Sequence, residues 1–125
     1  MGQQSFHKDE RLKKEKLIKE LFQKGSSFNF YPIRVIHLVH PEATNHHQAL
    51  FTVSARSFKR AVDRNRIKRR IRESYRLHKA ELMQKPKLIL GFVYNAPVEV
   101  KYDIIDSAMN KAILKLIRAY QHAAQ

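Results

Sequence analysis

Residues 57–83 hold the pattern that most constrains the fold of this chain. Side chains suited to a core recur there every three or four residues, the period of one face of an α-helix: Ile67, Ile71, Tyr75, His78 and Leu82. Ser57 can serve as the N-cap, and Pro86 limits the other end because the residue before a proline avoids helical angles. The pattern predicts one long helix with one face against a core.

The segments around this helix predict a small sheet. Residues 13–24 have the apolar period of a helix, and Gly25 follows as its stop. Residues 30–40 and 49–55 are rich in β-branched and aromatic side chains, as strands are. Residues 87–95 form a nearly continuous apolar run, which is typical of a strand covered on both faces.

A last helix is predicted to begin at Asp103, which can cap it. Its apolar stripe consists of Ile105, Met109, Ala112, Leu116 and Tyr120. The order of the elements predicts an α+β fold, a two-layer α/β sandwich in which three helices pack on a mixed sheet of about four strands.

Length and charge indicate one domain with a polyanionic partner. The 125 residues suit a single domain over 1–125, in which the polar residues 1–11 are expected to be flexible. The net charge of +14 favours nucleic acid, with an anionic membrane surface as the rival. No apolar run approaches the ~20 residues that span a bilayer, and the N-terminus lacks the apolar core of a signal peptide. The absence of cysteine excludes disulfides and thiolate metal sites, so a cytoplasmic protein is expected.

The stretch DRNRIKRRIRESYR, residues 63–76, carries six arginines and one lysine against two acidic residues. The cations form two rows, one of Arg64, Lys68 and Arg72 with Arg69 and Arg76 beside it, and one of Arg66 and Arg70. Like charges at this spacing repel by a few tenths of a kcal/mol per pair, so a helix that needed only solubility would carry more acids. Because arginine favours bidentate contact with phosphate, the stretch predicts a phosphate-binding surface.

Asn65 lies between two of these arginines, where asparagine adds little to helix stability. Its carboxamide can bond to a base edge or a ribose 2′-hydroxyl. It can equally be an exposed residue without a role, and the residues alone leave both interpretations open.

The longer stretch FTVSARSFKRAVDRNRIKRRIRESYR, residues 51–76, resembles the signature of the protein subunit of bacterial ribonuclease P. In that family a strand ending in V-[SA]-[KR] leads into a helix with R-N-R-x-K-R-x-x-R. The matching residues are Val53, Ser54, Arg56, Arg64, Asn65, Arg66, Lys68, Arg69, Arg72 and Glu73. The earlier segment with Arg11 to Lys14, Phe22 and Gly25 agrees as well, so the resemblance covers most of residues 11–120.

The resemblance implies a sandwich with an unusual left-handed β-α-β crossover and a role beside a catalytic RNA. Together the two remove the 5′ leader of precursor tRNA. Residues implied to bind the RNA subunit are Arg64, Asn65, Arg66, Lys68, Arg69 and Arg72. Residues implied to bind the leader, in a cleft between the first helix and the sheet, are Ile18, Phe22, Arg34, Ile36, Ser54, Arg56, Lys59 and Arg60.

Two positions depart from the family pattern. Ile18 falls where the family often has an aromatic residue, and Ala55 falls where a lysine is common, so Arg56 and its basic neighbours would have to compensate. Phe22 can stack on a base, but a role in ordinary core packing remains open for it.

Catalytic residues are not predicted in the chain itself. A Mg²⁺-dependent nuclease needs convergent carboxylates, and the 11 acids are scattered. His46 and His47 lie in a polar loop, where solvation is expected rather than catalysis or metal binding. We therefore expect an enzyme only in the sense of a subunit, with Mg²⁺ held mainly by the RNA and none bound tightly by the protein.

The expected partners are ribonuclease P RNA and precursor tRNA, with neither a membrane nor an obligate protein partner. The alternative is a ribosomal-type or other non-catalytic RNA- or DNA-binding module. A helix-turn-helix reader is disfavoured because a strand, not a helix, precedes the basic helix. A membrane-surface protein is a weaker alternative, since the apolar stripe has only the width of a core contact. A stand-alone nuclease is the weakest, since the acids do not converge.

Overall fold

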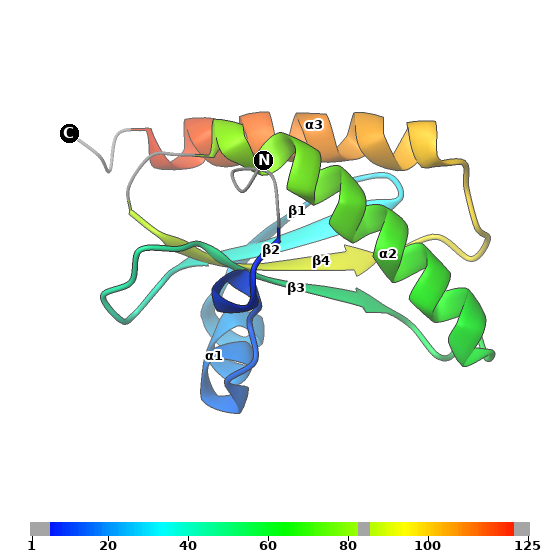
Figure 1. Cartoon of the computed structure of the whole chain (residues 1–125), viewed down its shortest axis with the longest axis horizontal. Helices are drawn as coiled ribbons and strands as arrows, with labels where there is room; N and C mark the ends of the chain where they lie inside the picture. Colours follow the sequence, from blue (N-terminus) through cyan, green and yellow to red (C-terminus); the bar gives the residue numbers. More distant parts are fainter. Residues whose placement is uncertain (1–5, 83–85, 122–125) are drawn as a thin grey trace.

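The computed structural model describes residues 6–82 and 86–121. Its elements in chain order are the 3₁₀ turn η2 (Lys8–Glu10), α1 (Glu15–Lys24), β1 (Ser26–Phe30), β2 (Ile33–Val39), β3 (Gln48–Val53), α2 (Ala61–His78), the 3₁₀ turn η3 (Lys79–Glu81), β4 (Leu88–Tyr94) and α3 (Tyr102–Tyr120). Figure 1 shows α2 and α3 on one side of the sheet and α1 on the other. The predicted α+β fold, with three helices on a four-stranded mixed sheet, is confirmed.

The sheet has the strand order β1-β2-β4-β3. The pairs β1–β2 and β2–β4 are antiparallel, whereas β3 and β4 are parallel neighbours. Parallel neighbours cannot be joined by a tight turn, so the chain crosses from β3 to β4 through α2. This connection is a β-α-β crossover unit, and the left-handedness that the family resemblance implied for it stays a prediction.

Two apolar clusters hold the layers together. The larger one joins the stripe of α2, at Ile67, Ile71 and Tyr75, to α3 and to Phe92 of the sheet. The smaller one lies under α1 and consists of Leu12, Leu17, Leu21, Ile36 and Ile89, with Ile18, Leu38, Leu50 and Val93 packed against it. β4 contributes to both clusters, which explains its continuous apolar run and confirms that it is covered on both faces.

The predicted strand over residues 30–40 proved to be parts of two strands. β1 ends at Phe30, the chain turns at Tyr31–Pro32, and β2 begins at Ile33. A proline has no N–H to donate to a neighbouring strand, so it marks a turn more readily than the interior of a central strand. β1 alternates between the half-buried Phe28 and Phe30 and exposed polar residues, a period of two that the sequence already contained.

Both predicted helix caps were wrong by a few residues. Ser57 lies in a turn, because the N–H of Phe58 donates to the carbonyl of Ser54, and α2 begins only after Arg60. Lys101 rather than Asp103 precedes α3, and Asp103 lies in the first turn, where its charge favours the helix dipole. The predicted helix end near residue 83 was also too late, because α2 ends at His78 and the 3₁₀ turn η3 follows it; residue 83 itself lies outside the described residues.

Gly25 ends α1, but the backbone does not adopt the left-handed conformation that usually requires glycine there. Its φ is −70°, which any residue can adopt. A Cβ atom at this position would lie 2.5 Å from the carbonyl oxygen of Leu21 and 2.9 Å from Cγ2 of Ile36. The close approach of helix and sheet therefore requires glycine here.

The N-terminal segment from Phe6 packs against the core, whereas the sequence led us to expect a loose terminus up to residue 11. Phe6 makes edge-to-face contacts with Phe51 and Tyr75, at ring centroid distances of 5.5 and 6.0 Å. Lys79 pairs with Glu10 at 2.5 Å, with both side chains largely buried. Residues 1–5 of the predicted flexible segment lie outside the described residues.

Candidate nucleic-acid interface

α2 presents its cations away from the core, as its period predicted. Ile67, Ile71 and Tyr75 are buried against the sheet and α3. The basic residues consequently lie on the remaining surface of a single rigid helix. All six predicted RNA-subunit-binding residues are thus placed on one helix, and they differ in the partners that their side chains have within the protein.

One arginine row of α2 is neutralised within the protein. Arg66 donates two hydrogen bonds to the carboxylate of Glu99, both at 2.8 Å, and a third at 2.8 Å to Asp63. Arg70 approaches the same Glu99 carboxylate to 2.7 Å. These hydrogen bonds raise the pKa of Arg66 and lower that of Glu99. The sequence did not reveal this pairing, because Glu99 lies in the segment before α3.

The other row carries uncompensated charge. Within residues 6–82 and 86–121, Lys68, Arg69 and Arg72 have no ion pair or side-chain hydrogen bond. Asn65 is exposed and is likewise without a side-chain partner in this part of the chain. These four side chains are available for an external ligand.

Arg64 is hydrogen-bonded within the protein and still lacks a carboxylate partner in the described chain. Its Nη1 donates to the carbonyl oxygens of Phe58 and Lys59, at 2.7 and 2.9 Å. The guanidinium therefore fixes the loop that enters α2, while its charge is not matched by a carboxylate among the described residues. Arg64 positions the neighbouring basic residues in addition to carrying charge of its own.

The sheet face on the α1 side is only partly covered. The register places Arg34 of β2, Val93 of β4 and Thr52 of β3 in one row across it. Arg34 is exposed and Thr52 and Val93 are partly exposed, whereas Ile36 in the adjoining register of β2 is 4% exposed under α1. We call Arg34, Thr52, Val93 and the adjacent Phe22 the open sheet face.

Phe22 borders this face from α1. Its side chain is 48% exposed, and its ring approaches the position where a Cβ of Gly91 would lie, to 4.0 Å. The alternative that Phe22 serves only core packing is thus disfavoured. Ile18 and Ile36 lie in the small apolar cluster instead, where they support α1.

The loop after β3 connects the open sheet face to α2. Ser54, Arg56, Lys59 and Arg60 are all exposed there, and the Ser54 hydroxyl accepts a hydrogen bond from the backbone N–H of Arg56. Arg60 Nε lies 4.0 Å from Asp63. The predicted leader-binding and RNA-binding residues thus adjoin one another along the chain from the end of β3 into α2.

Comparison with known proteins gives a consistent result. The family model described as Ribonuclease P matches residues 6–117. Ribonuclease P protein components from two strains of Porphyromonas gingivalis are each 30% identical over 115 residues, which covers 87% of this chain and 84% of the relative. This chain belongs to the ribonuclease P protein family.

Solved structures of the family have the same fold. The Staphylococcus aureus RNase P protein is 25% identical, with a TM-score of 0.72 over 89% of this chain and 97% of that one. The Thermotoga maritima RNase P protein is 16% identical, with a TM-score of 0.71 over 85% and 96% of the two chains. The similarity spans nearly the whole relative in both cases, so the shared fold covers most of this chain.

Two of the described histidines and one aspartate of this family member connect separate parts of the fold. His47, expected in a solvated loop, is half-buried: Nδ1 accepts a hydrogen bond from the N–H of Leu88, and Nε2 lies 2.6 Å from the carbonyl oxygen of Leu82. Asp106 bonds to the hydroxyl of Ser74 at 2.6 Å and lies 3.0 Å from Nε2 of His78. His47 ties a loop to β4, and Asp106 joins α3 to α2.

Groups of histidines and acids that could hold a metal ion are lacking in residues 6–82 and 86–121. Over the same residues, no helix is both long enough and apolar enough to cross a bilayer. Of the residues predicted to bind RNA, those with exposed basic or aromatic side chains lie on the uncompensated row of α2, in the loop at residues 54–60 and on the open sheet face.

Proposed function

We propose that this ribonuclease P protein binds the catalytic RNA through α2 and the 5′ leader of precursor tRNA on the open sheet face. The observation that supports it best is the division of charge on α2. Arg66 and Arg70 are neutralised by Glu99, whereas Lys68, Arg69 and Arg72 are left without an anion in the described chain.

Phosphate groups are the ligand that such a row fits. Guanidinium groups bind phosphate oxygens bidentately, and each phosphate that is neutralised releases counterions. Asn65 adds hydrogen-bonding groups that can reach a base edge or a 2′-hydroxyl. The rigid helix holds these groups at fixed spacing, so little ordering of the protein is required upon binding.

Single-stranded RNA fits the open sheet face. Unstacked bases bind where aromatic rings lie beside positive charge. Phe22 supplies an exposed ring and Arg34 an exposed guanidinium, and Arg56 follows at the end of β3. In this proposal Ile18 and Ile36 act from beneath, by holding α1 at the distance that leaves Phe22 exposed.

The chemistry of cleavage is assigned to the RNA partner and to Mg²⁺ that this RNA holds. In support, the described acids are engaged in ion pairs with basic residues or lie apart from one another. The protein would contribute affinity for the leader and neutralise phosphates near the reacting bond. This reduces the concentration of Mg²⁺ that the RNA needs for activity.

Cleavage of a precursor tRNA at low Mg²⁺ tests the proposal. We expect no cleavage with protein alone, slow cleavage with a bacterial ribonuclease P RNA alone, and rapid cleavage with both. The Arg69→Ala/Arg72→Ala variant should stimulate the RNA less. Lys16→Ala/Lys19→Ala removes the same charge from exposed positions of α1 and serves as the matched control.

Two results would contradict the proposal. Cleavage by purified protein alone would mean that a catalytic site exists in the chain. A cognate RNA that the wild-type protein fails to stimulate would leave only a general nucleic-acid-binding module.

A further inference from the structure

Two adjoining hollows lie beside α3, on the side of the sheet opposite to α1. The first has a volume of about 490 Å³ and is lined by Phe30, Lys111, Leu114, Lys115, Arg118 and Ala119. The second, of about 370 Å³, shares Phe30 and Lys111 with the first and adds Tyr31, Asp103, Ile104, Ser107 and Ala108. We call the two together the α3–β1 hollow.

Three cations from α3 border this hollow. Lys111, Lys115 and Arg118 lie at i, i+4 and i+7, so they share one side of the helix. All three are exposed, and within residues 6–82 and 86–121 none forms an ion pair. Asp103 is the one acid among the lining residues. The hollow thus carries net positive charge that the described chain does not neutralise.

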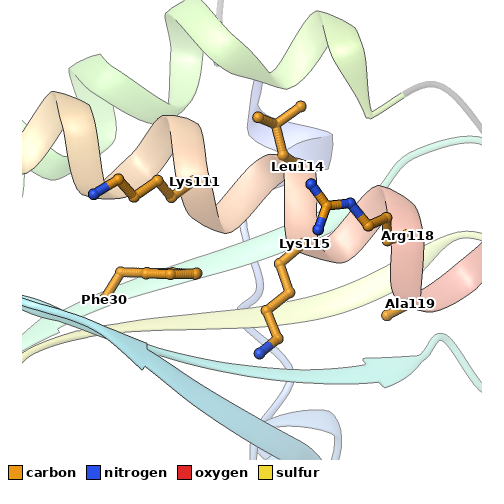
Figure 2. A pocket seen from close by; sticks show the side chains of 6 residues that line it. All are labelled: Phe30, Lys111, Leu114, Lys115, Arg118 and Ala119. Carbon is orange, nitrogen blue, oxygen red and sulfur yellow. The ribbon is translucent and has the colours of Figure 1, made fainter.

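Aromatic side chains from β1 and the following turn form the other wall. In Figure 2, Phe30 faces α3, with Lys111 and Lys115 reaching to either side of it. The Lys115 ammonium lies 5.1 Å from the ring centroid of Phe28 and 5.9 Å from that of Phe30, so cation–π attraction holds it over these two rings. Tyr31 is 62% exposed at the rim.

We propose that the α3–β1 hollow is a second RNA-binding surface that takes a short single-stranded RNA segment. Phosphates pair with Lys111, Lys115 and Arg118, and a base stacks on Tyr31. Exposed rings beside regularly spaced cations are what single strands require. An acidic protein segment would use the cations alone and would leave the exposed aromatic rim unexplained.

This surface is distinct from those of the proposed function. α3 and the open sheet face lie on opposite sides of the sheet, and none of the lining residues comes from α2. The hollow therefore binds RNA independently of α2 and of the leader. A protein with two separated RNA-binding faces can hold two segments of one folded RNA, or two RNAs, at a fixed distance.

A tryptophan reporter can test the hollow by itself. The chain has no tryptophan, so Tyr31→Trp gives one fluorescent signal at the rim. We expect a short oligouridylate to quench this fluorescence in the full-length protein. Counterion release predicts that each lysine–phosphate contact raises the affinity for RNA roughly tenfold at low salt. The same contact adds about 0.7 to the magnitude of the slope of log K against log salt.

Lys111→Ala/Lys115→Ala in the Tyr31→Trp background should weaken the quenching interaction by up to about 100-fold and lower the slope by about 1.4. Lys16→Ala/Lys19→Ala, with the same loss of net charge, should leave the affinity for oligouridylate within about threefold of the parent, because long-range attraction is screened. Arg69→Ala/Arg72→Ala should also leave it intact. This last variant separates the failure of this inference from the failure of the proposed role of α2.

Three outcomes would overturn the inference. The first is that oligouridylate does not quench the fluorescence of the Tyr31→Trp variant at any concentration that binds the protein. In the second, the Lys111→Ala/Lys115→Ala and Lys16→Ala/Lys19→Ala variants weaken quenching equally, which would indicate only general attraction. The third is equal quenching by an oligoglutamate of the same charge, which would assign the hollow to an acidic polypeptide.

Discussion

Arg72 and Arg66 lie on the same helix, yet replacing each by alanine should affect RNA binding differently. Arg72 has no ion pair within residues 6–82 and 86–121, so its charge is available to phosphate. The Arg66 guanidinium is already bound by Glu99 and Asp63. We expect Arg72→Ala to remove a phosphate contact and Arg66→Ala to disturb the protein instead.

The expected magnitude follows from the cations of α2 that lack a carboxylate partner: Arg64, Lys68, Arg69 and Arg72. Each neutralised phosphate contributes about 0.7–0.9 to the slope of log K against log salt, so α2 accounts for a slope of about 3. Arg72→Ala should lower the slope by nearly 1 and raise Kd five- to eightfold or so at ~0.1 M salt.

The assay is a titration of ribonuclease P RNA with protein, repeated from about 0.1 to 0.4 M monovalent salt at constant Mg²⁺. Thermal unfolding of each variant supplies the control. Arg72→Ala should leave Tm nearly unchanged, as for most surface substitutions. Arg66→Ala should lower Tm and change the slope less, because it breaks the link between α2 and Glu99. An equal reduction of the slope by both variants would refute the reasoning that internal pairing decides which arginines bind RNA.

Three further predictions concern other parts of the molecule. Gly25→Ala should destabilise the protein by about 1–3 kcal/mol in chemical denaturation, because the new Cβ would overlap the carbonyl oxygen of Leu21. Phe22→Ala should weaken binding of a precursor tRNA by about 1–3 kcal/mol when it carries a multi-nucleotide leader, but not when the leader is one nucleotide long. Burial lowers the pKa of His47 to about 4, so the unfolded chain takes up a proton first as the pH falls. The free energy of unfolding should therefore drop by about 3 kcal/mol between pH 6.5 and 4, and His47→Gln should remove this contribution.

Each of these predictions has a result that would contradict it. Unchanged stability of Gly25→Ala would mean that α1 can shift on the sheet without cost. An equal effect of Phe22→Ala on both leader lengths would place its role outside leader binding. A His47→Gln variant with the pH profile of the wild type would show that His47 does not titrate with folding.

The period of the basic segment was enough to predict α2 and its exposed cations. A stripe at Ile67, Ile71 and Tyr75 leaves only one side of a helix for the core, and the arginines must occupy the rest. The continuous apolar run of β4 likewise predicted a strand with both faces covered. In both cases the local spacing of apolar residues decides which side is buried, and the tertiary fold packs that side against the core.

Boundaries were predicted less well, because hydrogen bonds with nearby loops compete with propensity there. Ser57 is a residue type that favours the N-cap position. The chain turns there instead, because the N–H of Phe58 donates to the carbonyl of Ser54 and Arg64 donates to the carbonyl of Phe58, so α2 starts later. Pro32 divides a run that looks like one strand, because a proline cannot donate a hydrogen bond to a neighbouring strand.

The sequence by itself determined that this chain has a rigid arginine-rich helix, a covered central strand and a large positive charge, since each depends on composition or on neighbours along the chain. Only the tertiary structure decided which cations remain available. Glu99 reaches Arg66 across 33 positions and neutralises it, whereas Arg72 meets no such partner in the described chain. Ion pairs of this kind depend on how α2 and the segment before α3 are placed by the sheet, and no local pattern specifies that placement.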